Sequence, residues 1–285
     1  SNVDLADAIA PIDLGLEYDQ QYGFANPFTD FRNSNLSPHF PYTAQIWRTM
    51  WAQQTGTNVD GVIAIDPVAL SYILGAVGPI TMADGEVISK DNVVELTEST
   101  AYIRFPEDQL ARKQYLQNIA TAVVTKITGP VKSPRQLLDA LGRAVSERRI
   151  AIWSSVAEEQ KLLEETPLAH AIPDDAAPFA AVVLNNLGGN KLDYYLKTSI
   201  EYAADDCRGA TRASTVTVNL DNTVPNKPLP DYVAAAAGLS PDVPIEIPRG
   251  TNITSVRLFA TKDAKLSAAI LNGERVPAIV STERG

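Results

Sequence analysis

Cysteine is nearly absent from this sequence, and with it the sulfur chemistry that characterises many small domains. Cys207 is the one cysteine among 285 residues. A disulfide within the chain is therefore excluded, and so is a zinc or redox site built on paired cysteines. Sulfur gives no indication of the compartment in which the protein works.

Histidine is also scarce. His39 and His170 are the two histidines, and neither has a motif partner nearby in the sequence. No serine lies in a G-x-S-x-G pattern, so a Ser-His-Asp hydrolase has little support. Catalytic residues, if there are any, stay unknown at this level.

Basic residues are outnumbered by acidic ones. The chain has 24 Lys and Arg against 34 Asp and Glu, a net charge of -10 and a pI near 4.7. Such a surface repels phosphate backbones, so no nucleic-acid partner is expected. An acidic protein can still hold one basic pocket.

Long apolar runs are missing as well. No stretch approaches the ~18 apolar residues of a membrane-spanning helix, and Ser1–Leu5 does not resemble a secretory leader. Either the protein is cytosolic, or an anchor lies outside this sequence.

The hydrophobic content of 45% is sufficient for a substantial core in one large domain or two. We predict an α/β domain over residues 1–190, with a mixed sheet flanked by helices, and a β-rich, sandwich-like domain over residues 191–285 that is itself incomplete. Residues 1–42 lack periodicity and predict an irregular wrapping segment with one short helix near Asp4–Ile12.

Helical and strand patterns alternate through the first domain. The apolar spacing and the Pro and Gly positions predict the following elements: helices over 42–54, 67–77, 90–97, 106–127, 134–148 and 158–165, strands over 59–65, 150–153 and 179–184, and a hairpin over 80–88. From Tyr194 onward, period-two alternation at Thr198–Tyr202, Val216–Leu220, Ile245–Ile247 and Val256–Leu258 predicts short strands.

Two blocks of the sequence carry a resemblance to a known family. Val59–Pro67 with Gly78-Pro79 is one, and Lys191–Leu196 with Cys207 downstream is the other. They resemble an envelope family, common in actinobacteria, that is known as domain of unknown function 4012, over most of residues 30–285. The resemblance implies an extracytoplasmic location and an N-terminal membrane anchor outside this sequence.

A more distant resemblance is to the LytR-CpsA-Psr ligases, which transfer polyprenyl-pyrophosphate-linked glycopolymers to peptidoglycan. The similar elements are Ile65-Asp66, Gly78–Ile80, an Arg-bearing strand at Tyr102–Arg104, then Asp108 and Arg112–Gln114. The ligase pattern has arginines where this sequence has Pro106 and Lys113. The resemblance implies a pyrophosphate-binding fold.

Arg104, Arg112, Lys113, Gln114 and Asp108 form the candidate ligand-binding set. If the segment ending at Arg104 packs beside the following helix, the two guanidinium groups converge, and their planar forks suit phosphate oxygens. The alternative is that Arg104 pairs with Glu107 or Asp108 and that the other charges are solvated, as surface charges usually are.

Asp60 and Asp66 flank one apolar strand and could bind Mg²⁺ if further carboxylates join them. Asp66 before Pro67 also has the position of a helix N-cap, for which Asp is strongly preferred, and this interpretation is favoured. No cofactor is required by the sequence, and Mg²⁺ is the one it would suit.

Two further features have competing interpretations. The polar, Gly-rich loop Asn185–Lys191 could present N–H groups to an anion or sugar, although a connector between domains is the favoured interpretation. Aromatic residues could line a lipid or sugar groove, but Trp47 and Trp51 have the helical spacing of core residues.

Two functions follow as hypotheses. The chain is either a non-catalytic envelope domain that binds a glycan, a lipid-linked (pyro)phosphate or a protein, or a phosphotransferase similar to the glycopolymer ligases. The degraded arginine pattern and the lack of a recognisable base favour the binding domain.

Overall fold

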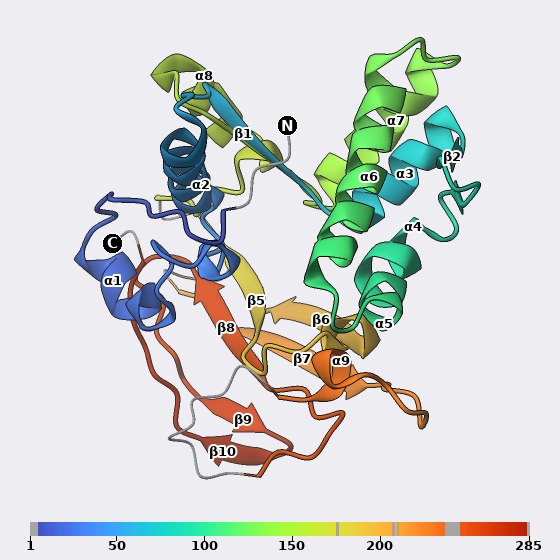
Figure 1. The fold of residues 1–285 in the computed structure, drawn as a ribbon. Coiled ribbons are helices and arrows are strands. Elements are labelled where there is room, and N and C mark those ends of the chain that lie inside the picture. Colours follow the sequence, from blue (N-terminus) through green and yellow to red (C-terminus); the bar gives the residue numbers. More distant parts are fainter. Residues whose placement is uncertain (1–4, 175–176, 207–208, 210, 237–245, 284–285) are drawn as a thin grey trace. The chain divides into compact units, whose positions relative to one another are not determined.

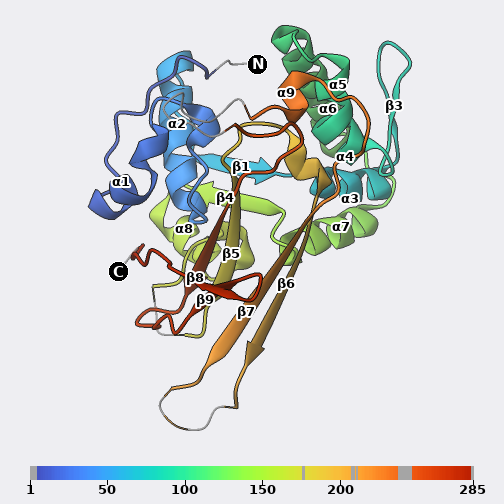
Figure 2. The same cartoon turned by 90° about the horizontal axis from the view of Figure 1, so that it is seen from below.

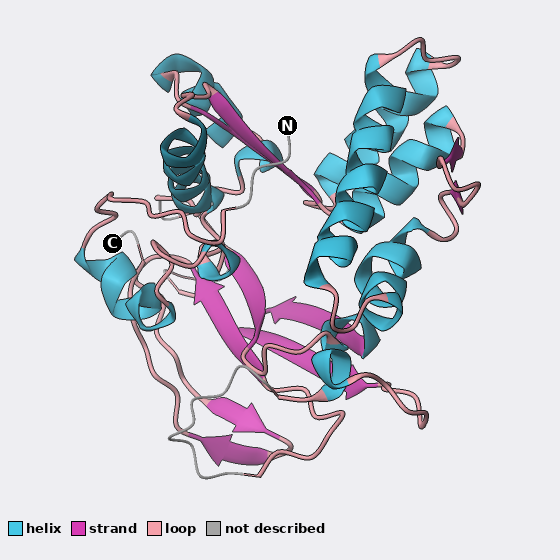
Figure 3. Cartoon of the chain, in the orientation of Figure 1, coloured by secondary structure: helices cyan, strands magenta, loops and turns pink. Residues whose placement is uncertain are grey.

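The computed structural model describes residues 5–174, 177–206, 209, 211–236 and 246–283 (Figure 1). Helices and strands alternate along the chain, which confirms the predicted α/β composition (Figure 3). Cys207 and the predicted strand residue Ile245 lie outside the described residues.

The chain forms two compact units, each assembled from more than one stretch of sequence. Unit 1 comprises Ser1–Asp91, Val123–Ala181 and Phe259–Gly285, and unit 2 comprises Asn92–Ala122 and Val182–Leu258. This grouping differs from the predicted division of the chain into two consecutive domains near residue 190. That division stays a prediction.

Unit 1 contains most of the helices. Its elements are α1 (Leu16–Tyr22), η1 (Gly23–Ala25), η2 (Phe31–Asn33), α2 (Phe40–Thr55), β1 (Gly61–Ile65), α3 (Pro67–Val77), β2 (Ile80–Thr81), β3 (Val87–Ile88), α7 (Pro134–Ser146), β4 (Ile150–Ser154), α8 (Ala157–Glu164), η4 (Pro167–Ala169), β9 (Ala269–Leu271) and β10 (Glu274–Val276). The predicted bounds of α3 are confirmed, and α2 ends at Gly56, whose φ of 68° is left-handed.

The centre of unit 1 is the antiparallel pair β1–β4, in which Ile63 lies opposite Ile152. One face of this pair packs on α2, where Phe40, Ala44 and Trp47 contact Val62, Ala64, Ala151 and Trp153. The expected core position of Trp47 is thereby confirmed, since period-two alternation directs one set of strand side chains to the helix.

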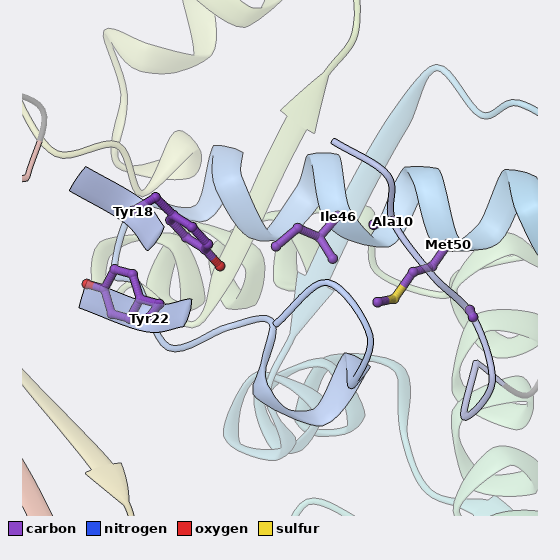
Figure 4. Close-up of a cluster of buried hydrophobic side chains, with 6 residues drawn as sticks. Ala10, Tyr18, Tyr22, Ile46 and Met50 are labelled. Atoms are coloured by element: carbon purple, nitrogen blue, oxygen red, sulfur yellow. The ribbon is translucent and has the colours of Figure 1, made fainter. Parts of the chain in front are cut away.

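The short helix predicted near Asp4–Ile12 is wrong for its described residues, because the first helix begins at Leu16. Ala8 and Ala10 instead pack as non-helical chain against Tyr18, Ile46 and Met50 (Figure 4). The Ala10 N–H donates to the Phe28 carbonyl at 2.8 Å, and Pro11 follows at once, so a helical ladder cannot continue there.

Unit 2 combines helices and long strands. Its elements are α4 (Val93–Glu95), a π-helical turn (Leu96–Thr100), α5 (Ala101–Arg104), α6 (Gln109–Thr128, which continues into unit 1), β5 (Ala180–Asn186), η5 (Leu192–Tyr195), β6 (Leu196–Ala204), β7 (Ser214–Asn222), α9 (Asp231–Ala234) and β8 (Thr254–Ala260). Leu192, Leu229, Val233 and Ala234 form its buried cluster, against which Tyr102 and Tyr195 pack.

The strand that the ligase resemblance implied at Tyr102–Arg104 is wrong. Residues 93–104 form one helical run that passes through the π-turn, and the Phe105 N–H still donates to the Ala101 carbonyl. Short apolar segments do not distinguish a strand from a buried helix by period alone, and here the preceding helix propagates through them.

The strands pair two by two instead of forming a larger sheet. The described pairs are β1–β4, β2–β3, β5–β8, β6–β7 and β9–β10. Figure 2 shows β6 and β7 as a long hairpin whose register places Ile200 opposite Val218. The predicted alternation is confirmed for these strands, and their side chains are mostly exposed.

Candidate anion-binding site

Arg112 is a nearly buried cation in unit 2. It lies in the first turn of α6 and its side chain is folded back under the end of α5, with 5% of the residue exposed. Nη1 donates to the carbonyl of Phe105 at 2.6 Å and more weakly to that of Pro106 at 3.4 Å. Part of the guanidinium therefore satisfies carbonyls that follow the last turn of α5.

Two tyrosines form the walls around this guanidinium. The rings of Tyr102 and Tyr232 are nearly parallel, with an angle of 10° and 6.1 Å between centroids. Arg112 Cζ lies 4.1 Å from the Tyr232 centroid and 5.4 Å from the Tyr102 centroid. These distances are typical of cation–π contacts.

Lys191 brings a second cation to the same rings. Its Nζ lies 5.3 Å from the Tyr102 centroid and 6.0 Å from the Tyr232 centroid. The Lys191 N–H donates to the Val233 carbonyl at 3.0 Å, which ties this residue to α9. Arg112 and Lys191 thus both lie against the same pair of tyrosine rings.

Neither cation has an acidic partner within the described part of the chain. Asp231, the acid next to Tyr232, is paired with Arg249. The Arg112 nitrogens other than Nη1 form no hydrogen bond among these residues, and they are not sealed from solvent. Arg112 and Lys191 therefore concentrate positive charge at the two rings of a protein of net charge -10, and the charge of Glu98 also acts on Tyr102.

The phenol of Tyr102 stays protonated beside these cations. Burial, with Tyr232 next in importance, raises its pKa, and the positive charge of Arg112 opposes this shift. A neutral phenol leaves the charge of the cluster positive and supplies a hydrogen-bond donor.

The side chains of the other predicted ligand residues have contacts outside the two-tyrosine cluster. The guanidinium of Arg104 is exposed and lies over a different ring, with 5.0 Å between its Cζ and the Tyr115 centroid. Lys113 and Gln114 are exposed on α6, and the Gln114 side chain donates to Asn118 at 2.8 Å. A ligand role for these three residues stays a prediction.

Asp108, also in the predicted set, is the N-cap of α6. Its carboxylate accepts a hydrogen bond from the Ala111 N–H at 2.9 Å, while its carbonyl accepts from Arg112. The helix N-terminus near the cluster is thereby occupied by a protein carboxylate.

Asp66 is the N-cap of α3, as the favoured interpretation predicted. Its carboxylate accepts from the Ala69 N–H at 2.7 Å and pairs with Arg149 at 2.8 Å. Over the described ranges, no group of three or more His, Cys, Asp or Glu side chains is placed to hold a metal ion. The proposed Mg²⁺ role of Asp66 stays a prediction.

The Gly-rich loop before Lys191 is held by its own side chains. Asn186 Nδ2 donates to Asp193 at 2.9 Å, and its Oδ1 accepts from the Gly188 N–H at 2.8 Å. The buried Asn190 donates to the Thr251 carbonyl at 3.2 Å. These bonds position Lys191. No pattern in the sequence indicated that Lys191 or Tyr232 belongs to the cluster around Arg112.

The comparisons with known proteins add one finding. Residues 2–102 match the family model described as protein of unknown function (DUF4012), which includes the quoted block Val59–Pro67 but not Lys191–Leu196. No curated protein and no solved structure gave a match. In the described residues, no helix is both long enough and apolar enough to span a bilayer. Over residues 2–102, this chain is similar to the family of proteins of unknown function DUF4012.

Proposed function

We propose that this chain is a non-catalytic domain of the cell envelope, in which Arg112 and Lys191 hold a ligand that carries phosphate or pyrophosphate. The observation that carries the proposal is the buried Arg112 without an acidic partner among the described residues. A lipid-linked pyrophosphate or a phosphate-bearing glycan at the extracytoplasmic face of the membrane is the ligand class that we infer.

The physical reason is the cost of an uncompensated cation. Removing a guanidinium from water is unfavourable unless charge and hydrogen bonds compensate it. Two carbonyls and two ring faces satisfy one side of Arg112. An anionic oxygen at the other side would form charge-assisted bonds with both Arg112 and Lys191.

A phosphotransferase would need more than this cluster. Metal-assisted transfer requires carboxylates that hold the ion, and Asp66 is engaged by Ala69 and Arg149. The phosphotransferase stays a hypothesis that no specific contact favours over binding.

The test is a thermal-shift titration with four probes: inorganic phosphate, inorganic pyrophosphate, a short-chain polyprenyl pyrophosphate and the corresponding polyprenol, each with and without Mg²⁺. A ligand at ~100 times its Kd stabilises the folded protein by about 2.7 kcal/mol. We expect both pyrophosphates to stabilise the chain and the polyprenol to have no effect. A further gain for the prenylated probe would indicate a lipid-linked ligand.

Arg112→Gln and Lys191→Gln should each remove at least about half of this shift, because a tenfold weaker affinity leaves about 1.4 kcal/mol at the same ligand concentration. Arg135→Gln on α7 and Lys197→Gln on β6 change the net charge equally at exposed positions and should preserve the shift. Undiminished stabilisation in both site variants, or no stabilisation of the parent protein, would refute the proposed site.

A further inference from the structure

In unit 1, the outer edge of β1 has free backbone groups. Asp60 accepts from the Ser155 N–H at 2.8 Å and the Asp66 N–H donates to Arg149 at 3.2 Å, so even-numbered residues face β4. Antiparallel pairing alternates these directions, which turns the N–H and C=O groups of Gly61, Ile63 and Ile65 outward. Within the described part of the chain, these outward N–H and C=O groups have no hydrogen-bond partner.

The opposite edge of the same pair is protected. On β4, the outward Ser154 N–H donates to Gln160 Oε1 of α8 at 3.0 Å, and the Ser154 hydroxyl donates to Glu159 at 2.7 Å. An edge that is left open beside a covered one is a template for strand pairing.

The side chains at the open edge are apolar and accessible. Ile63 is 62% exposed and Ile65 is 42% exposed. Beside them lies an open groove of about 590 Å³, to which Ile152 and the 64% exposed Leu162 contribute. Apolar surface next to unpaired backbone groups is the combination that strand-adding partners use.

The groove also has a charge of one sign. Asp60 and Glu159 line it, and none of the described residues that line it is basic. The side chain of Asp60 has no partner among the described residues, while Glu159 accepts a neutral hydroxyl. An apolar occupant with a basic side chain would neutralise this end of the groove.

We propose that unit 1 binds an extended, apolar peptide segment that carries Lys or Arg, and that this segment pairs with β1 as an added strand. Alternate side chains of the peptide enter the groove over Ile63 and Leu162, while a basic side chain reaches Asp60 and Glu159. A second copy of the chain is the weaker candidate, because it would bring the same acids to an already acidic groove.

The experiment measures fluorescence anisotropy of a labelled peptide of alternating valine and threonine, flanked by lysines. A matched peptide has glutamates in place of the lysines, and a third has prolines at alternate positions. We expect the lysine peptide to bind, the glutamate peptide to bind at least tenfold more weakly, and the proline peptide not to bind.

Variants separate the edge from the charges. Ile63→Pro removes an outward N–H while leaving the β1–β4 ladder bonds in place, and should abolish binding. The double variant Asp60→Asn with Glu159→Gln keeps both side-chain shapes and should weaken binding of the lysine peptide at least tenfold. Glu158→Gln, on α8 but outside the groove lining, is its control and should bind normally.

Equal binding of the lysine and glutamate peptides, or normal binding by the double variant, would overturn the proposal. So would a dimer of the unliganded protein, seen by light scattering and abolished by Ile63→Pro, since it would identify a second copy as the occupant. The double variant keeps the test decisive if Ile63→Pro fails to fold.

Discussion

Arg149 in unit 1 and Arg112 in unit 2 show two ways of placing a guanidinium. Arg149 donates through Nε to Glu147 at 2.9 Å and through Nη1 to Asp66 at 2.8 Å, and 32% of its side chain is exposed. Arg112 is nearly buried and donates to carbonyls alone, with tyrosine rings around it. Carboxylates of the protein neutralise the charge of Arg149, whereas no acidic side chain among the described residues neutralises that of Arg112.

The difference distinguishes a cation that carboxylates neutralise from one that the proposed site leaves to a ligand. Glu147 accepts from Arg149, Arg143 and the Tyr72 hydroxyl, so this cluster is complete by itself. The Arg112 cluster has hydrogen-bonding capacity left over within the described residues. A buried charge that no acidic side chain compensates is an indicator of a functional site.

The largest effect on stability should come from Arg112→Met, with Arg149→Met as the comparison. Arg112→Met removes a charge-assisted hydrogen bond and two cation–π contacts, and should lower the free energy of unfolding by about 2 kcal/mol. Arg149→Met breaks partly exposed ion pairs and should cost less than ~1 kcal/mol. Urea denaturation measures both, and equal losses would mean that the two environments do not differ as described.

Lys191→Met should affect binding more than folding. Losing one of two cations should weaken pyrophosphate affinity about tenfold, equivalent to about 1.4 kcal/mol. Stability should change by less than ~0.5 kcal/mol, because a partly exposed lysine without an ion pair contributes little. Isothermal titration calorimetry measures the affinity for pyrophosphate, and urea denaturation measures the stability. A loss of stability without a loss of affinity would assign Lys191 a structural role.

A smaller effect should appear as a pH dependence of unit 1. Hydrogen bonds from Arg149, Tyr72 and Arg143 lower the pKa of Glu147 to about 2. A lowered carboxyl pKa stabilises the fold above the ordinary pKa of 4.5, and this contribution is lost as the pH falls toward 2. The stability difference between the parent and Glu147→Gln should therefore be present at pH 6 and shrink below pH 4.5, whereas a constant difference would contradict the assignment.

The smallest effect concerns His170. Burial, and then the charge of Arg148, lower its pKa below 6.5, and its Nε2 is buried without a partner. The unfolded chain therefore binds the proton more readily, so stability should fall as the pH drops through and below 6.5. Asn tolerates the left-handed φ of 45° at this position, and His170→Asn should lose less stability between pH 7 and pH 5 than the parent. Thermal denaturation at the two pH values tests this, and identical losses would exclude His170 as the source.

Local features of the fold could be predicted from the sequence. Signals that extend over only a few residues predict such features. Examples are the Asp66 cap with Pro67, the apolar spacing of α3 and the left-handed Gly56. The segment 101–104 could not be assigned in this way, because four residues carry too little periodicity and the helix there continues from residues before it. Its actual state is set by propagation and by packing of Tyr102 in the unit 2 core.

Only part of the candidate site could be predicted from the sequence. Arg112 was identified from its position near the start of a helix, but Arg104, its expected partner, lies over Tyr115. Lys191 and Tyr232 come from separate segments, and no spacing in the sequence links them to α6.

The sequence by itself determined the acidic charge, the exclusion of a disulfide within the chain, and the caps and periods that define most helices and strands. Those properties depend on composition or on neighbours a few residues apart. Only the tertiary structure decided that Arg149 meets carboxylates while Arg112 meets carbonyls and tyrosines. The compensation of a charge is a property of contacts between distant segments, and those contacts exist only after the chain has folded.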